Sequence, residues 1–453
     1  MTNPSRHARW RKRLSALMAQ YHVPGAAMGI LRVATGRPDE IIEVASGVLS
    51  RATRVAATPD SLFHIGSITK AWTASLVMRL VDQGKVDLDT PVRRYLPDLA
   101  LSDPDATNAV TLRQLLAHTS GIDGDHWADF GRGDDAVEKY VASLEKVPIS
   151  HAPGSLFSYS NAGYVLAGRV VEVMSGMSWD EALRTSLCRP LGLTDTVTDP
   201  RNTTANLATG HQCGPAGAPV ASAAISRAIG PAGIISSTVR DLLRFAGLHL
   251  TGGLALDGTR VLSEHSVDVM RSVQVRLPDD REFPDAWGLG WALSRVDDVE
   301  VAGHDGNISD QAAFLRIVPE AGLAIAILTN VADASELGHA LIRDVLADEL
   351  GVRLPPRPAP AAGGQIDELS PDWLGRYERT ARTLTVSSSA AGLVLIEQRS
   401  QADTERYPIT PTGLDSFLAW NDASRTWMPG SFTVVAGRRF LHFALRATPE
   451  SER

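Results

Sequence analysis

Cysteine is nearly absent from this chain of 453 residues, which contains only Cys188 and Cys213. Two cysteines cannot form a disulfide framework, and their spacing does not suit a metal site, so we expect free buried thiols. Apolar runs of about eighteen residues, long enough to cross a bilayer, are also missing. The net charge of −8 reflects no basic excess. We therefore expect neither a membrane nor a nucleic acid among the partners.

The N-terminal segment is basic but lacks a continuous apolar stretch followed by a small-residue cleavage site. We interpret it as an amphipathic first helix with Leu14, Leu17 and Met18 packed inward. This interpretation predicts a cytoplasmic protein. The chain is long enough for one large domain and a smaller one.

A serine and a lysine lie three residues apart in the stretch from Phe63 to Asp89, which has the apolar spacing of a helix. Side chains at i and i+3 share a helix face, so Lys70 can reach the hydroxyl of Ser67. Ser67 would lie at the helix N-terminus, where free N–H groups favour a developing oxyanion. Burial and the helix dipole would lower the pKa of Lys70 toward that of a useful base. The alternative is a solvated pair on a surface helix.

The sequence around this pair resembles the penicillin-binding protein and class C β-lactamase superfamily of serine hydrolases. The resemblance includes FHIGSITK, the run 84–92 and LLAHTSG from Leu115 to Gly121. It implies an α/β (α+β) fold, with an antiparallel sheet flanked by helices and an all-helical region. For His118 in the last run, we expect a structural role at a helix end.

Tyr159-Ser160-Asn161 matches the second element of the superfamily, Tyr-x-Asn. The resemblance implies that Tyr159 carries a proton between Ser67 and the leaving group, which a depressed pKa would assist. Asn161 would orient Lys70 and the substrate.

His304-Asp305-Gly306 occupies the place of the third element, which is Lys-Thr-Gly in class C β-lactamases and His-x-Gly in several related peptidases and esterases. His304 would polarise Tyr159 or bind a substrate carboxylate, and Gly306 would leave room for the acyl chain. We expect Gly306 and Asn307 to bind substrate, and a backbone N–H between His304 and Asn307 to help hold the oxyanion. The departure from Lys-Thr-Gly argues against β-lactamase activity.

The polar segment from Asp123 to Asp135 carries several carboxylates and His126. Its spacing is not that of a calcium loop, so we interpret it as a hydrogen-bonded surface loop near the substrate cleft. We expect no metal and no cofactor.

The C-terminal part changes character. We expect a catalytic domain over 1–352, a linker rich in Pro, Ala and Gly over 353–366, and a β-domain over 367–453. Six alternating runs predict a small antiparallel barrel or sandwich: 384–389, 393–398, 405–410, 417–420, 431–436 and 440–446. This domain resembles the lipocalin-like appendage of some superfamily members.

The last of these runs places Leu441, Phe443 and Leu445 on one face and His442 and Arg446 on the other. The planar guanidinium of Arg446 could bind a substrate carboxylate with two parallel hydrogen bonds. The alternative is a solvated arginine near the chain end.

Three functions fit these features. The first is a stand-alone thioesterase that forms an acyl-enzyme on Ser67 and releases a peptidyl chain, with or without a carrier protein, by macrolactam cyclisation or hydrolysis. The second is a cytoplasmic esterase or D-amino-acid peptidase. The third, a catalytically silent binding protein, is disfavoured by the intact set of Ser67, Lys70, Tyr159 and Asn161. The substrate class would be small or peptidyl esters, thioesters or amides.

Overall fold

The computed structural model describes residues 4–33, 40–199, 206–220, 225–278, 284–360, 369–380, 382–390, 392–399 and 403–451. The helices are α1 (Pro4–Gln20), α2 (Thr69–Asp82), α3 (Pro104–Ala109), α4 (Leu112–Leu116), α5 (Ala136–Ser143), α6 (Asn161–Ser175), α7 (Trp179–Leu183), α8 (Arg189–Leu191), α9 (Gly230–Gly233), α10 (Val239–Leu250), α11 (Glu264–Arg271) and α12 (Ser335–Leu350).

The strands before the linker are β1 (Gly25–Arg32), β2 (Glu40–Gly47), β3 (Phe63–His64), β4 (Ser236–Ser237), β5 (Val275–Arg276), β6 (Ala286–Trp287), β7 (Ala292–Val296), β8 (Val299–Ile308), β9 (Gln311–Val318) and β10 (Leu323–Thr329). The strands after it are β11 (Gly375–Arg379), β12 (Arg382–Ser389), β13 (Gly392–Gln398), β14 (Thr404–Gly413), β15 (Ser416–Asn421), β16 (Thr426–Val435), β17 (Arg438–Phe443) and β18 (Arg446–Pro449).

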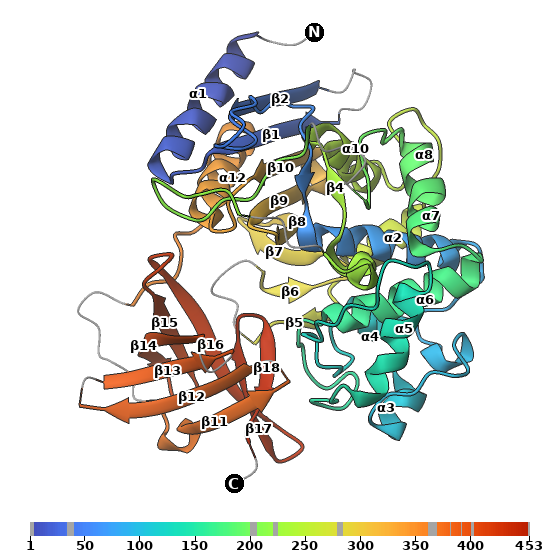
Figure 1. The fold of residues 1–453 in the computed structure, drawn as a ribbon, viewed down its shortest axis with the longest axis vertical. Coiled ribbons are helices and arrows are strands. Elements are labelled where there is room, and N and C mark those ends of the chain that lie inside the picture. The colour runs from blue at the N-terminus through green and yellow to red at the C-terminus, as the bar shows by residue number, and fades with distance from the viewer. Residues whose placement is uncertain are drawn as a thin grey trace.

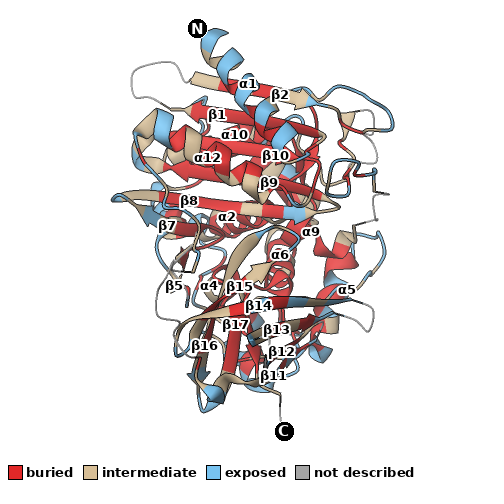
Figure 2. Cartoon of the chain, turned by 90° about the vertical axis from the view of Figure 1, so that its left-hand side faces the viewer, coloured by how far each residue is buried: buried red, intermediate tan, exposed pale blue. Residues whose placement is uncertain are grey.

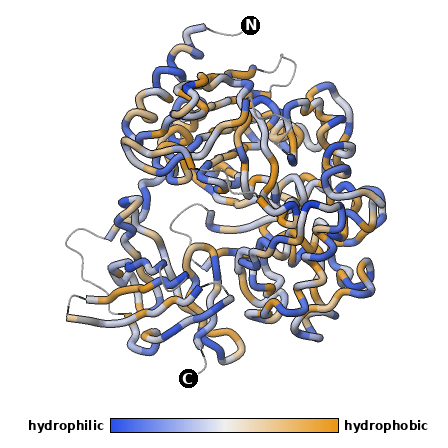
Figure 3. Tube along the Cα trace, viewed as in Figure 1, coloured by the Kyte–Doolittle hydropathy of each residue, from blue (hydrophilic) through white to orange (hydrophobic). Residues whose placement is uncertain are grey.

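An antiparallel sheet of eight strands, ordered β2-β1-β10-β9-β8-β7-β6-β5, forms the centre of the first domain. Alternate residues of β1 point to opposite faces, so Met28 packs with α1 and α12 while Ala27 and Leu31 join the core beneath α2 and α10. The central strands are buried on both faces (Figure 2). They form the apolar centre of the trace in Figure 3. The expected sheet flanked by helices is confirmed.

Helix α1 buries Leu14, Leu17 and Met18, as its apolar spacing predicted, and it also buries Trp10. No helix in the described ranges is long and apolar enough to cross a membrane. Both cysteines are free, but only Cys188 is buried. The expectation of two buried thiols was therefore wrong for Cys213, which lies exposed in a loop.

The helical region lies beside β5–β8 and contains α2 and α6, which pack against each other (Figure 1). Two helices of this region begin at side-chain caps. Thr111 and Gln114 form a capping box at the start of α4, and Ser160 caps α6 by accepting a hydrogen bond from the N–H of Gly163. Helix α2 ends at Asp82, and Gly84, with a φ of 66°, supplies the left-handed turn after it. The Ser160 cap fixes the start of α6 and with it the position of Asn161.

Strands β11 to β18 form an antiparallel meander in sequence order. The edge strands meet, because Tyr377 pairs with Glu450 and the N–H of Ser451 donates to the carbonyl of Arg376 at 2.8 Å. The predicted antiparallel β-domain is confirmed as a nearly closed barrel. The last predicted strand, 440–446, was wrong, because the structure divides it between two strands. β17 ends at Phe443, and Arg446 begins β18. Between them, Ala444 and Leu445 form a two-residue turn with positive φ.

The tip of this last hairpin contacts the first domain. The N–H of Tyr159 donates to the carbonyl of Leu445 at 2.9 Å, and the N–H of Ala447 donates to the hydroxyl of Ser158 at 3.2 Å. Leu445 also packs against the apolar cluster that contains Tyr159 and Trp287. The barrel therefore ends directly against the segment that carries the Tyr-x-Asn motif.

Candidate active site

Ser67 lies in a single 3₁₀ turn, Gly66–Ile68, that leads into α2. The Nζ atom of Lys70 is 3.0 Å from the Ser67 hydroxyl and 2.7 Å from the carbonyl oxygen of Ala232 in α9. The carbonyl oxygen can only accept, so an N–H of Lys70 donates to it, and this hydrogen bond fixes the orientation of the amine. A neutral amine held in this way turns its lone pair toward the Ser67 O–H. The geometry is that of an activated nucleophile.

Burial lowers the pKa of Lys70 well below its usual value, and the positive charge of Arg446 lowers it further. The carboxylate of Asp125 opposes this effect and raises the pKa of Lys70. Lys70 is completely buried, so it has no water to stabilise an ammonium group. The predicted depression of the lysine pKa agrees with this environment.

Tyr159 lies beside both groups, with its ring centre 4.8 Å from the Lys70 nitrogen. Burial raises the pKa of Tyr159 above its usual value, although a hydrogen bond with Ser67 and the charge of Arg446 act in the opposite direction. The expected depressed pKa was therefore wrong, because the loss of hydration outweighs the nearby cations. Tyr159 is a neutral phenol here, whose hydroxyl can donate one hydrogen bond and accept another, so it can give up its proton as it receives one.

His118 has the structural role that the sequence suggested. Its ring stacks on Tyr159 with 4.1 Å between ring centres, and its Nδ1 accepts a hydrogen bond from the N–H of Ser160. Its φ of 58° is left-handed, which turns the chain at the end of α4. His118 thus holds the tyrosine ring and the following cap of α6 in place.

His304 is buried on β8, and its Nδ1 is 2.7 Å from the carbonyl oxygen of Asp305. Because that oxygen accepts, the proton is on Nδ1, and Nε2 is left as an acceptor. Nε2 is buried and has no partner in the described part of the chain. Burial, with a contribution from Lys70, lowers the pKa of His304 to about 3. His304 is therefore neutral, not a cation as one of the expected roles required.

Gly306 lies where β8 meets the turn that carries Ser67. A Cβ atom on Gly306 would lie 1.9 Å from the carbonyl oxygen of Ile65 and 3.0 Å from the N atom of Ser67. Strand β7 pairs with β8 only as far as Gly303, so the next part of β8 has one edge open toward this turn. Only glycine allows so close an approach.

The two asparagines of the motifs line the same cavity. Asn161 occupies the first position of α6, but no hydrogen bond joins it to Lys70 among the described residues, so it does not orient the lysine directly. The side-chain amide of Asn307 donates to the carbonyl of Ala332 at 3.1 Å. The cavity has a volume of about 210 Å³ and is lined by Gly66, Ser67, Trp127, Tyr159, Asn161, Ile229, Ala232, Gly233, Asn307, Ile308 and Arg446.

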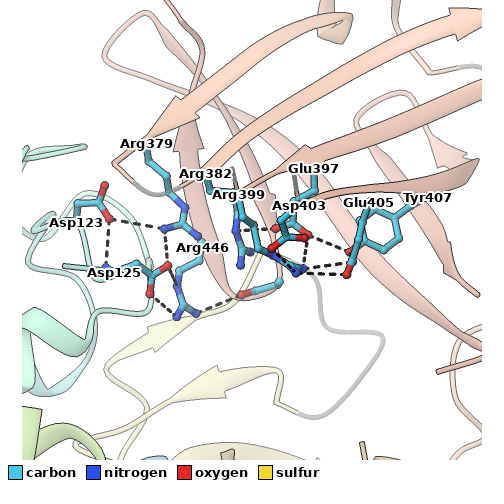
Figure 4. A network of polar contacts seen from close by, with 11 residues as sticks. Asp123, Asp125, Arg379, Arg382, Glu397, Arg399, Asp403, Glu405, Tyr407 and Arg446 are labelled. Carbon is cyan, nitrogen blue, oxygen red and sulfur yellow. Dashed lines mark hydrogen bonds and ion pairs between the residues drawn. The ribbon is translucent and has the colours of Figure 1, made fainter. Parts of the chain in front are cut away.

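Arg446 reaches this cavity from the barrel, with its guanidinium carbon 4.8 Å from the ring centre of Tyr159. It is paired with Asp125 of the first domain, and Asp125 is also paired with Arg379 of β11 (Figure 4). Asp123 accepts from the N–H of Thr380 at 2.8 Å. Both aspartates are buried. The prediction of a surface loop was wrong for these residues, because the barrel covers them.

No group of three or more His, Cys, Asp or Glu side chains placed to hold a metal occurs within the described ranges. The sequence also did not identify Ala232, Asp125, Arg379 and Trp127 as parts of the site. Ala232 and Arg379 act through contacts between distant segments and have no local signal. Trp127 is 62% exposed at the edge of the cavity, and an aromatic residue in a polar loop could have been taken as a hint of binding.

The chain is similar to several known proteins. A sequence model of the family described as Beta-lactamase matches residues 10–348. Penicillin-binding protein 4 of Amycolatopsis lactamdurans is 42% identical over 382 residues, covering 83% of this chain and 98% of that protein. The crystal structure of SurE with D-Leu has a TM-score of 0.79 at 30% identity and covers 99% of this chain and 100% of that one. The chain therefore belongs to the β-lactamase and penicillin-binding protein family of serine hydrolases.

Proposed function

We propose that this protein is a penicillin-binding-protein-type thioesterase that forms an acyl-enzyme on Ser67. It releases a peptidyl chain from a thioester by macrolactam cyclisation or hydrolysis, and a carrier protein would present the substrate. The catalytic domain would span 1–352, the linker 353–366 and the β-domain 367–453.

In the first half of the reaction, Lys70 takes the proton of Ser67 as the Ser67 oxygen bonds to the carbonyl carbon. The Ser67 N–H and an N–H of the open edge of β8, between His304 and Asn307, hold the oxyanion. The bond to sulfur then breaks. Tyr159 gives its phenolic proton to the departing thiolate and regains a proton from Lys70, so charge and protons balance.

In the second half, the amine at the other end of the chain, or water, attacks the acyl-enzyme. Lys70 and Tyr159 remove the proton of this nucleophile and return one to Ser67 as the ester bond breaks. Cyclisation requires that the amine reach the ester before water does. The barrel contributes Arg446 to the lining of the cavity, and we propose that it limits the access of water to the acyl-enzyme.

One observation carries this proposal: a guanidinium from the barrel, that of Arg446, lies in the cavity of Ser67. Hydrolysis of an acyl-enzyme needs no guanidinium from a second domain, so the presence of Arg446 favours a reaction in which a further group of the substrate is held. The likeness to SurE extends over both domains, and the printed description of that structure contains D-Leu. These facts support a substrate whose acyl group ends in a D-residue.

The same arginine favours a second candidate, a D-amino-acid peptidase or esterase. A guanidinium is suited to bind a free terminal carboxylate. The leaving group would then be a residue with a carboxylate, and not a carrier thiol.

The test begins with a fluorophosphonate probe, which should label Ser67 in the wild type and nothing in Ser67→Ala. A peptidyl N-acetylcysteamine thioester ending in D-Leu should then give cyclic and linear products, and its L-Leu counterpart should react at least about tenfold more slowly. Arg446→Ala should lower turnover, whereas Arg438→Ala, an exposed arginine of the same barrel, should not. Exclusive cleavage of a carboxylate-bearing D-peptide would establish the second candidate. Equal labelling of Ser67→Ala would exclude both.

A further inference from the structure

Asp125 is a buried carboxylate that lies between two guanidinium groups from the other domain (Figure 4). Arg379 donates through Nη1 to Oδ2 at 2.5 Å. Arg446 donates through Nη2 to Oδ1 at 3.1 Å and through Nε to Oδ2 at 3.4 Å. Burial alone would raise the pKa of Asp125, but Arg446 and Arg379 hold it well below its usual range. Asp125 is therefore ionised, and both of its oxygens are in use.

This contact fixes the plane of the Arg446 guanidinium. A guanidinium has five N–H groups; two bind Asp125 and one donates to the carbonyl of Ala444, so two have no partner among the described residues. Arg446 lines the cavity of Ser67, so these two groups are the ones available to a substrate. Without Asp125, the long side chain would lose the partner that selects this rotamer.

We propose that Asp125 is a positioning residue, which holds the guanidinium of Arg446 in the Ser67 cavity with two N–H groups available to an anionic group of the substrate. This rests on the role that the second candidate function gives Arg446, which is to bind a substrate carboxylate. Arg379 acts on Arg446 indirectly, through its ion pair with Asp125. It is 3% exposed at its side chain, and its Nε and Nη2 are buried without partners in the described part of the chain, so it holds Asp125 as its main counter-charge.

Asp125 has a second effect, through charge. Its carboxylate raises the pKa of Lys70, whereas Arg446 lowers it. Removing the charge of Asp125 would leave Arg379 and Arg446 without their shared counter-ion near the lysine. Lys70 would then lose its proton at a lower pH, and a reaction that needs the neutral amine would begin at a lower pH.

A simple docking role for Asp125 makes a different prediction, and Asp123 provides the control. Asp123 binds the barrel through the N–H of Thr380 and lies 3.7 Å from Arg379, but it has no contact with Arg446. If these aspartates only dock the barrel, Asp123→Asn and Asp125→Asn should behave alike. If Asp125 positions Arg446, only its substitution should alter substrate preference.

The experiment compares Asp125→Asn, Asp125→Glu and Asp123→Asn in the full chain, after thermal unfolding has confirmed that each folds. The rate of Ser67 acylation by p-nitrophenyl acetate, which carries no charge, is measured against pH. On the acidic limb of the profile, the pH at which the acylation rate begins to rise should be lower in Asp125→Asn only. Asp125→Glu, which retains the charge, should keep the wild-type limb.

The second measurement is kcat/KM for two ester substrates. In one the leaving group carries a free carboxylate, and in the other that carboxylate is methylated. The wild type should prefer the carboxylate, and both Asp125 variants should lose about tenfold of that preference, chiefly through KM. Asp123→Asn should retain it. Equal profiles and preferences in Asp125→Asn and Asp123→Asn would overturn the positioning role. A wild type without any preference, together with a shifted limb in Asp125→Asn, would instead reject the proposed role of Arg446 while confirming the charge effect.

Discussion

Lys70 has a fixed neighbour on each side, the hydroxyl of Ser67 and the carbonyl of Ala232, and no contact with water. An amine in this position is useful for proton transfer but unfavourable for folding. The unfolded chain keeps Lys70 protonated below its usual pKa, whereas burial lowers the pKa of Lys70 in the folded chain. Between these two values, folding releases a proton, so the free energy of unfolding rises with pH.

We therefore predict that Lys70→Met abolishes acylation and yet raises the urea midpoint at pH 7, because an apolar side chain replaces a buried amine. The gain should shrink as the pH approaches that of an ordinary lysine pKa, where the unfolded chain also becomes neutral. Ser67→Ala is the control, since it removes the nucleophile and leaves the amine. A gain that did not change between pH 7 and pH 10 would contradict the assignment of a neutral Lys70.

At this scale the sequence predicted a good deal. Ser67, Lys70 and Tyr159 belong to short motifs, and the helix spacing of the first two is a local property. The direction of the Tyr159 pKa was predicted wrongly, because it depends on burial by His118, Trp287 and the barrel tip. Asp125 was part of an acidic loop in the sequence, and its partners lie more than 250 positions away.

At the scale of elements, strand β8 and the turn before α2 must touch for an oxyanion site to exist. Gly306 makes this contact possible, since any side chain there would meet the carbonyl of Ile65. The order of these elements followed from the motifs. The two-residue turn between β17 and β18 did not, because its residues are Ala444 and Leu445, without the glycine or asparagine that usually marks such a turn.

We predict that Gly306→Ala lowers the rate of Ser67 acylation about a hundredfold, the scale seen when an oxyanion donor is lost. The added methyl group would push β8 away from the turn and leave the lysine in place. Gly230→Ala, whose Cβ would have 3.5 Å to its nearest neighbour, serves as the control. Acylation by a p-nitrophenyl ester measures both. Near-normal rates in Gly306→Ala would show that β8 does not contribute to the oxyanion site.

At the scale of the whole molecule, the two domains share one site. The barrel supplies Arg446 and the carbonyl that binds the N–H of Tyr159, and the first domain supplies Asp123 and Asp125. The sequence predicted a second domain from its composition and alternating runs. It could not predict the docking, because the contacting residues show no pattern until both folds are known.

Deleting the residues after Gly364 should therefore lower acylation by a neutral ester at least about tenfold, since Tyr159 loses its support and a positive charge near Lys70 disappears. In the control, a protease site is inserted after Gly364 and the chain is cut without separating the parts. Acylation should persist there, because the buried contacts of Asp125 remain. A truncated chain that reacts at the full rate would show that the first domain is a complete catalyst.

The hydrogen bond from the N–H of Tyr159 to the carbonyl of Leu445 spans the two domains at the centre of the site. That proton can exchange with solvent deuterium only when the barrel tip moves away. A single backbone amide thus records how often the domains part, on a time scale that substrate turnover does not reveal. Its exchange rate, compared with that of amides inside α6, separates opening of the cavity from unfolding of the helix behind it.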